Sequence, residues 1–294
     1  MTDMDEPVSF QNRSLAIRGM IGSPDGPDSG AGVVLLHGWG SCRLGPHRIL
    51  VETARELNRR GFWTLRFDHL GRGESEGNAD DATLDGMISD ACAAAEYLSS
   101  KGNVKRLAFL GLCSGGNVAI GSASLIQGRG DKRAAFDIPA LVLWSTLPFQ
   151  TQRKRAADVK RTGFFLTQYV RKALMPQTWK KLVEGKVNFG AIGKVLFGHY
   201  RREEEKDGKK SNPKDSSRDI MDEFSSFKGA VLYVYGGGDP EAAGARQAYE
   251  PFCRERGIRA EFHTIEGANH NYYSLEWKEE IIGRSATFLE INMK

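Results

Sequence analysis

Residues 111–116 read GLCSGG, directly after an apolar run typical of a buried strand and directly before a segment compatible with a helix. A sharp strand-to-helix turn strains the backbone of its central residue, so the residues two before and two after it must be small. Gly111 and Gly115 meet this requirement only if Cys113 is the central residue. The pattern therefore predicts that Cys113, rather than Ser114, is presented as a nucleophile. A buried thiol beside a helix-capping serine is the alternative reading of the same residues.

Short apolar runs like the one before this turn recur along the chain, with helix-length segments between them. One such segment, residues 81–99, carries an apolar stripe at helical spacing, and Gly102 is its expected terminator. Repeated alternation of strand and helix predicts an α/β protein with a mostly parallel central sheet and helices on both faces. The predicted strands lie at residues 33–36, 62–67, 107–111, 140–144, 231–235 and 260–265, and residues 8–21 fit an opening hairpin.

The alternation fails once, between residues 144 and 229, where no strand pattern is found. Short amphipathic patterns with aromatic residues indicate helices in this stretch. We interpret residues 146–224 as a helical lid inserted into a core formed by residues 1–145 and 225–294.

The predicted lid contains a strongly basic block. Residues 151–186 hold ten Lys or Arg against Asp158 and Glu184, a local charge of +8 (ten minus two), in a chain whose net charge is +4. Such a block favours an anionic small-molecule substrate, peripheral contact with an anionic membrane, or nucleic acid, and it is equally compatible with a solvated helix face. Nucleic acid is the weakest of these hypotheses because no recognisable nucleic-acid module is present.

The composition is that of an ordinary globular protein, with 294 residues, 40% hydrophobic and 27% charged, which excludes disordered and collagen-like classes. The four cysteines form no CxxC pair, which argues against a zinc site and a disulfide framework. The first ten residues are acidic and carry no apolar run typical of a secretory signal, and no run reaches transmembrane length. We expect a cytoplasmic protein with neither metal nor cofactor.

The tetrapeptide HGWG, residues 37–40, follows the first buried strand and can direct a backbone N–H at a reacting carbonyl oxygen. The backbone N–H groups of Trp39 and Ser114 are therefore predicted to form an oxyanion hole, with Ser114 contributing only its backbone. The stretch DHLGRGES, residues 68–75, follows the next strand and is expected to be a structural turn beneath the site.

A nucleophile needs a base, and the base needs an orienting acid. Asp239 lies in the loop GGGDP after one predicted strand, and His270 lies in the loop GANH after the next. His263 falls inside a strand and is a poorer base. The chain order nucleophile, acid, histidine predicts a triad of Cys113, Asp239 and His270, although Asp239 also fits the simpler role of a helix cap.

From the HGWG loop through GLCSGG to GGGDP and GANH, nearly the whole chain resembles the α/β-hydrolase superfamily. The GLCSGG turn is similar to that of its cysteine-centred members, such as dienelactone hydrolases and polyhydroxyalkanoate synthases. Residues 169–192 resemble hydrolases found with bacterial exosortase and exopolysaccharide systems, which implies a bacterial cytoplasmic enzyme. A cysteine in place of the usual serine makes an ordinary esterase or lipase activity less expected.

These residues favour a hydrolase that cleaves an ester, thioester or lactone through an acyl group carried on Cys113. Because a thioester reacts readily with amines and thiols, an acyltransferase using a thioester donor is the second hypothesis. A non-catalytic binding module on the same fold is the third, since a fold alone does not establish activity.

Overall fold

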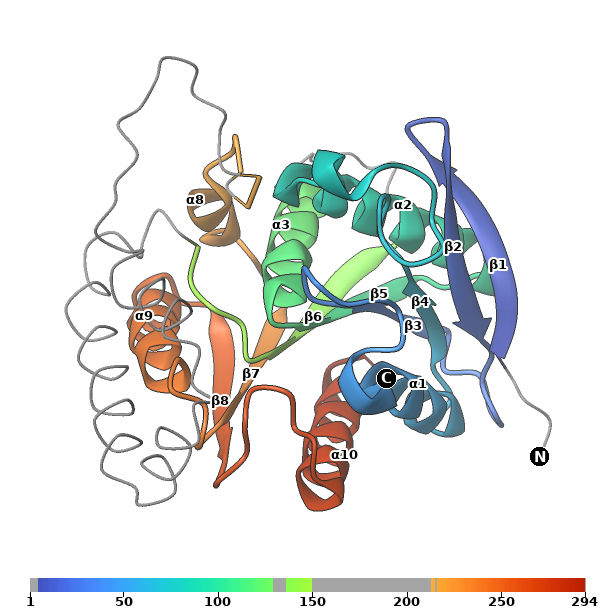
Figure 1. Ribbon diagram of the computed structural model, residues 1–294. Helices are drawn as coiled ribbons and strands as arrows, with labels where there is room; N and C mark the ends of the chain where they lie inside the picture. Colours follow the sequence, from blue (N-terminus) through green and yellow to red (C-terminus); the bar gives the residue numbers. More distant parts are fainter. Residues whose placement is uncertain (1–4, 129–135, 150–212, 215, 294) are drawn as a thin grey trace, which may run out of the picture. The chain divides into compact units, whose positions relative to one another are not determined.

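The computed structural model describes residues 5–128, 136–149, 213–214 and 216–293. They form one sheet with helices on both faces (Figure 1). The strands are β1 (Asp5–Asn12), β2 (Leu15–Gly22), β3 (Ala31–Leu36), β4 (Trp63–Phe67), β5 (Arg106–Leu112), β6 (Asp137–Trp144), β7 (Ala230–Gly236) and β8 (Arg259–Ile265). The helices are α1 (Ile49–Arg59), α2 (Leu84–Gly102), α3 (Ser114–Gly128), α8 (Ile220–Phe224), α9 (Ala242–Glu255) and α10 (Leu275–Met293), with short 3-10 turns η1 (Pro46–Arg48) and η2 (Ala79–Asp81).

The strand order is β1-β2-β4-β3-β5-β6-β7-β8. Strand β2 pairs antiparallel with β1 and with β4, and all other neighbours are parallel. Every predicted strand lies in this sheet, and the predicted hairpin forms its β1–β2 edge. The mostly parallel α/β architecture is therefore confirmed.

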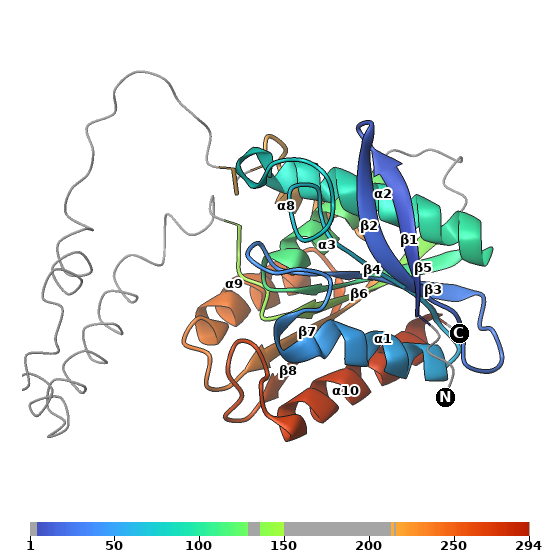
Figure 2. The ribbon, with the colours of Figure 1, turned by 45° about the vertical axis from the view of Figure 1, so that its right-hand side comes forward.

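Two hydrophobic layers hold the helices on the sheet. One layer joins the sheet to α1 and α10, and the other joins it to α2, α3, α8 and α9 (Figure 2). Strands β3 and β7 are buried along their whole length. Because both faces of these parallel strands are covered, their sequences are continuously apolar rather than alternating.

Helix α2 begins and ends later than its sequence pattern predicts. Its first residue is Leu84, capped by the Thr83 side chain, which accepts a hydrogen bond from the Gly86 N–H. Gly102 is the last helical residue, and Asn103 adopts the left-handed conformation (φ 48°) that ends the helix. A Cβ at Gly102 would lie 2.9 Å from the Trp63 ring. Gly102 is thus required for close packing rather than for helix termination.

Most of the predicted lid, residues 150–212 and residue 215, lies outside the described residues, and so does the basic block. The chain divides into two units, the first of which comprises Met1–Gln150 and Pro213–Lys294. Helix α8, inside the predicted lid boundaries, packs against α3, and Phe224 stacks on Phe227 with ring centroids 5.5 Å apart. None of the described helices is long and apolar enough to cross a membrane.

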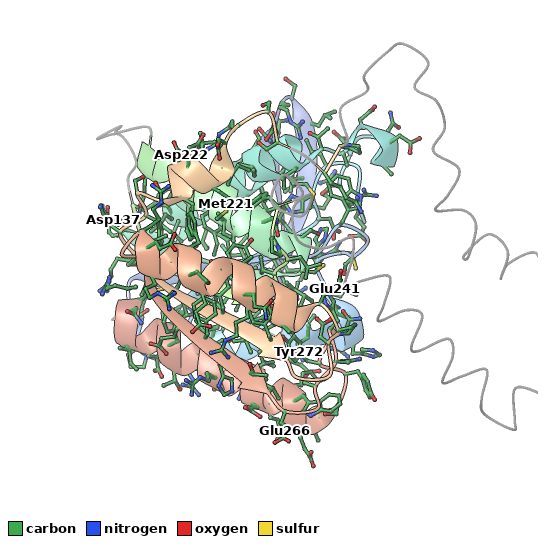
Figure 3. The ribbon with its side chains drawn as sticks, turned by 90° about the vertical axis from the view of Figure 1, so that its left-hand side faces the viewer. Asp137, Met221, Asp222, Glu241, Glu266 and Tyr272 are labelled. Atoms are coloured by element: carbon green, nitrogen blue, oxygen red, sulfur yellow. The ribbon has the colours of Figure 1, made fainter. Side chains whose placement is uncertain are left out.

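The fold gathers the predicted site residues at one end of the sheet. The carboxyl ends of the parallel strands β3 to β8 lie along a single edge, where ligands bind in open α/β sheets. Figure 3 shows Glu241 and Tyr272, from the loops after β7 and β8, toward this end, whereas Asp137 at the start of β6 lies at the other.

Candidate active site

Cys113 occupies the turn between β5 and α3. Its φ of 57° is left-handed, which is uncommon for a residue with a side chain and marks a strained position. The Cys113 N–H donates to the Trp144 carbonyl at 2.8 Å, and the Gly116 N–H donates to the Cys113 carbonyl at 3.0 Å. The sheet therefore holds Cys113 from one side and the first turn of α3 holds it from the other.

The small residues around Cys113 are required by backbone contacts. A Cβ at Gly111 would overlap the carbonyl oxygen of Gly115, and a Cβ at Gly115 would overlap the carbonyl oxygen of Leu36 in β3. The spacing that points to Cys113 as the central residue thus corresponds to two places where the backbone approach leaves no room for a side chain.

The loops after β7 and β8 bring Asp239 and His270 together. The Gly237 and Gly238 N–H groups each donate at 2.8 Å to carbonyls of the facing loop, those of Ile265 and Ala268. As a result, Asp239 Oδ2 lies 2.7 Å from His270 Nδ1. The other carboxylate oxygen accepts the Glu241 N–H at 3.0 Å. Asp239 therefore both shapes the turn before α9 and orients the imidazole.

His270 and the thiol of Cys113 are close enough to shift each other's pKa. The hydrogen bond with Asp239, and then the influence of Cys113, raise the pKa of His270 to about 10. Burial raises the pKa of Cys113, but the contact with His270 and the backbone N–H of Ser114 outweigh burial and leave the thiol pKa below its usual value. The His270 imidazolium thus favours the ionised form of the Cys113 thiol.

Two residues that the sequence analysis did not single out, Ser145 and Tyr272, hold the backbone around His270. Ser145 Oγ donates to the His270 carbonyl at 3.2 Å and lies 2.8 Å from the Tyr272 hydroxyl. The Tyr272 hydroxyl lies 3.0 Å from the Val234 carbonyl in β7, to which it donates. Ser145 (φ 46°) and Tyr272 (φ 51°) both have left-handed backbones. No sequence signal could pair them, because they are 127 positions apart.

The structure places Trp39 and Ser114 beside Cys113. A Cβ at Gly38 would lie 3.4 Å from the Cys113 Cβ, so the HGWG loop packs directly on the turn. The backbone N–H of Trp39 donates to Ser114 Oγ at 2.7 Å. The backbone N–H of Ser114 helps to lower the pKa of the Cys113 thiol. Of the two predicted oxyanion donors, the Trp39 N–H therefore already has an acceptor.

The stretch at residues 68–75 forms a tight turn around a buried carboxylate. Asp68 accepts hydrogen bonds from the backbone N–H groups of Arg43 (2.6 Å) and Glu74 (3.1 Å), and it forms an ion pair with the Arg43 side chain. This turn holds together the loops after β3 and β4, consistent with the expected structural role.

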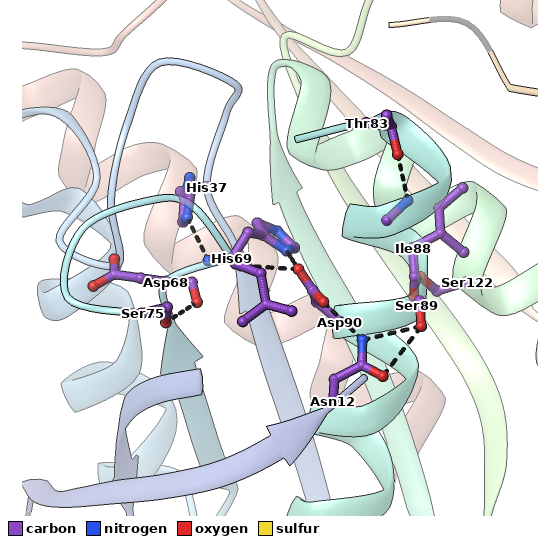
Figure 4. A network of polar contacts seen from close by, with 12 residues as sticks. Asn12, His37, Asp68, His69, Ser75, Thr83, Ile88, Ser89, Asp90 and Ser122 are labelled. Atoms are coloured by element: carbon purple, nitrogen blue, oxygen red, sulfur yellow. Dashed lines mark hydrogen bonds and ion pairs between the residues drawn. The ribbon is translucent and has the colours of Figure 1, made fainter. Parts of the chain in front are cut away.

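His37, the first residue of HGWG, is buried behind the same loops (Figure 4). Its Nδ1 lies 2.8 Å from the Gly38 carbonyl, and its Nε2 accepts the His69 N–H at 3.4 Å. Burial, and then the neighbouring His69, lower the pKa of His37 to about 3. His37 is therefore neutral at pH 7, and its two ring nitrogens connect the HGWG loop to the loop after β4.

Two cations flank the Trp39 ring. The Arg72 guanidinium carbon lies 5.4 Å from the ring centroid, and the Lys214 ammonium lies 5.7 Å from it. Both distances are within the range of cation–π attraction. Positive charge therefore lies beside the HGWG loop, on side chains from two other segments.

The remaining sequence-predicted alternative lies elsewhere. His263 sits within β8, 2.7 Å from the Glu280 carboxylate, and it has no place beside Cys113. Among the described residues, no group of three or more His, Cys, Asp or Glu side chains is arranged to hold a metal ion.

A family model described as "Alpha/beta hydrolase family" matches residues 33–283. The chain belongs to the alpha/beta hydrolase family. The match covers the HGWG loop, the GLCSGG turn, Asp239 and His270. This match identifies the protein as an enzyme of the hydrolase class.

Three solved structures illustrate the shared fold. Est1E from Butyrivibrio proteoclasticus, with ferulic acid bound, is 17% identical with a TM-score of 0.63, covering 97% of this chain and 98% of that one. A dienelactone hydrolase from Anabaena variabilis is 14% identical with a TM-score of 0.62, covering 99% and 98%. An esterase from Pyrococcus furiosus is 21% identical with a TM-score of 0.62, covering 99% and 91%. At these identities the likeness concerns the fold alone. No curated protein sequence matches the chain.

Proposed function

We propose that this alpha/beta hydrolase cleaves an ester, thioester or lactone through a covalent acyl-enzyme on Cys113, with His270 as acid–base and Asp239 as its orienting carboxylate. The observation that carries the proposal is the hydrogen bond from His270 to Asp239, together with the mutual influence of His270 and Cys113 on each other's pKa. The neighbouring serine hydroxyl accepts a hydrogen bond from the Trp39 N–H. The similarity of the GLCSGG turn to cysteine-centred members of the superfamily supports the same assignment.

The proposed cycle begins with the Cys113 thiolate, which attacks the substrate carbonyl carbon. A C–S bond forms and the π electron pair moves to the carbonyl oxygen, which becomes an oxyanion. When this intermediate collapses, the electron pair returns, the bond to the leaving group breaks, and His270 gives its proton to the departing atom. Water then attacks the thioester, His270 takes a proton from it, and the free acid leaves as the thiolate is restored.

The final acceptor distinguishes hydrolysis from acyl transfer. We expect incubation of the enzyme with an activated thioester to yield mainly free acid, and an added amine or alcohol to change this product little. Cys113→Ala should form no free acid above the uncatalysed rate. Diversion of most of the acyl group to the added acceptor would favour the acyltransferase, and turnover by Cys113→Ala would reject the nucleophile assignment. Loss of all acyl chemistry in the wild-type protein would favour a binding module.

We further propose that the substrate carries a negative charge. Arg72 and Lys214 beside Trp39 support this, as does the basic block in the sequence. Peripheral binding to an anionic membrane is a related proposal that rests on the basic block alone. For the compartment we propose the bacterial cytoplasm, because all four cysteines are free thiols and because of the resemblance of residues 169–192.

Arg72→Gln should reduce the preference for an anionic over a neutral substrate of matched acyl group by roughly three- to tenfold, measured as kcat/KM at low salt. The preference of the wild-type enzyme should also fade as salt is added, because ions screen exposed charges. Lys105→Gln, which removes the same charge before β5 at the far end of the sheet, is the matched control and should leave the preference unchanged. Equal reaction of both substrates with the wild type would rule out this substrate class.

A further inference from the structure

The hydrogen bond between Trp39 and Ser114 changes the expected composition of the oxyanion hole. The sequence assigns the Trp39 N–H to the substrate oxygen. In the structure that N–H donates to Ser114 Oγ at 2.7 Å, a short and well-formed bond. The oxyanion could reach the Trp39 N–H directly only if the hydroxyl moved away. The hydroxyl instead lies where the sequence predicts the oxyanion.

A serine hydroxyl can accept one hydrogen bond and donate another at the same time. Ser114 Oγ accepts from Trp39, so its own hydrogen remains available for a third group. Within the described residues we find no acceptor for that hydrogen, and Ser114 is partly exposed at the turn. Ser114 follows Cys113 directly in the turn between β5 and α3, and its side chain is next to the HGWG loop. A carbonyl oxygen bonded to the attacked carbon would therefore form close to this hydroxyl.

We propose that the Ser114 hydroxyl is itself an oxyanion-hole donor, with the Trp39 N–H behind it as a second donor in a relay. The inference rests on the proposed function, in which Cys113 is the nucleophile. During attack the Ser114 O–H donates a hydrogen bond to the developing oxyanion and keeps its proton. The Trp39 N–H continues to donate to Ser114 Oγ, which polarises the hydroxyl, because hydrogen bonds in a chain strengthen one another. The Ser114 backbone N–H supplies the other donor.

This relay gives Ser114 a role that its backbone alone would not supply. The sequence-based expectation treats the hydroxyl as dispensable, so alanine at this position would keep the oxyanion hole intact. The relay makes the hydroxyl necessary. With alanine at position 114, the Trp39 N–H would have no partner and would lie too far from the oxyanion to take over the role of the hydroxyl.

Ser114→Ala should lower kcat for an oxygen ester by about 10²- to 10³-fold, the effect of removing one oxyanion-hole donor. Iodoacetamide should alkylate Cys113 in this variant at close to the wild-type rate, since alkylation forms no oxyanion. Ser114→Thr restores a hydroxyl and should recover much of the lost kcat. Unchanged or faster ester turnover by Ser114→Ala would overturn the relay and show that the Trp39 N–H binds the oxyanion directly.

A thionoester substrate separates a lost donor from a disturbed structure. Its developing negative charge lies on sulfur, a weak hydrogen-bond acceptor, so the loss caused by Ser114→Ala should shrink to about tenfold or less. An equal loss for ester and thionoester would mean that the variant merely distorts the turn, and the relay would be rejected. The Cys113→Ala variant distinguishes failure of the proposed function from failure of the relay. Turnover by Cys113→Ala would reject Cys113 as the nucleophile, whatever the result for Ser114.

Discussion

His270→Ala should lower kcat by on the order of 10²- to 10⁴-fold, the usual contribution of a positioned acid–base group. The same change should move the pH midpoint of Cys113 alkylation upward. In the folded protein the imidazolium, whose pKa is raised to about 10 mainly by Asp239, stabilises the thiolate and lowers the thiol pKa. Without it, burial remains and disfavours the charged form, so the thiolate appears only at higher pH.

His263→Ala is the matched control for this prediction. His263 is also a histidine close to the end of a strand, but it pairs with Glu280 rather than with Cys113. Its removal should change kcat by no more than about twofold, and it should move the pH midpoint of Cys113 alkylation by no more than a few tenths of a pH unit. A wild-type midpoint near that of an ordinary free thiol, unaffected by His270→Ala, would show that His270 and Cys113 do not form an ion pair.

Gly111→Ala should reduce the free energy of unfolding by about 3 kcal/mol or more, a large part of the stability of a typical domain. An added Cβ would overlap the Gly115 carbonyl oxygen, and neither backbone segment can move without separating α3 from the sheet. Urea unfolding followed by circular dichroism gives the measurement. Activity should fall with stability, because Cys113 depends on the same turn.

Gly128→Ala provides the comparison on the same helix. Gly128 is the last residue of α3, and among the described residues no atom outside its chain neighbours and its own helix backbone lies within 4 Å of an added Cβ. This change should alter stability by no more than about 1 kcal/mol. Equal effects of the two alanines would mean that the GLCSGG turn is not as tightly packed as the structure indicates.

The strands and the turn could be predicted from sequence because their signals are local. Buried parallel strands require continuous apolar runs, and the close approach of β5 and α3 requires Gly111 and Gly115 at fixed spacing. The pairing of Asp239 with His270 was predicted from chain order, and the loops that join them use glycines visible in GGGDP and GANH. These features need no knowledge of distant contacts.

The parts that escaped prediction depend on residues far apart in the chain. The motifs bring Trp39 and Ser114 together, but they do not predict that the Trp39 N–H donates to the Ser114 hydroxyl 75 positions away. Ser145 contacts Tyr272 across 127 positions, and no local pattern marks that pair. Gly102 shows the converse error. A local rule predicts that this glycine terminates helix α2, whereas its close packing against Trp63 is what requires a glycine there. Tertiary packing therefore decides the details that refine the site.

The most direct test of the central claim is the mass of the protein after incubation with an activated ester that deacylates slowly, followed by mapping of the modified peptide. The wild-type protein should gain one acyl group on Cys113, and Cys113→Ala should gain none. Ser114→Ala should still gain the group on Cys113, at a lower rate. Persistence of the adduct in Cys113→Ala together with its loss in Ser114→Ala would contradict the account and identify the enzyme as a serine hydrolase.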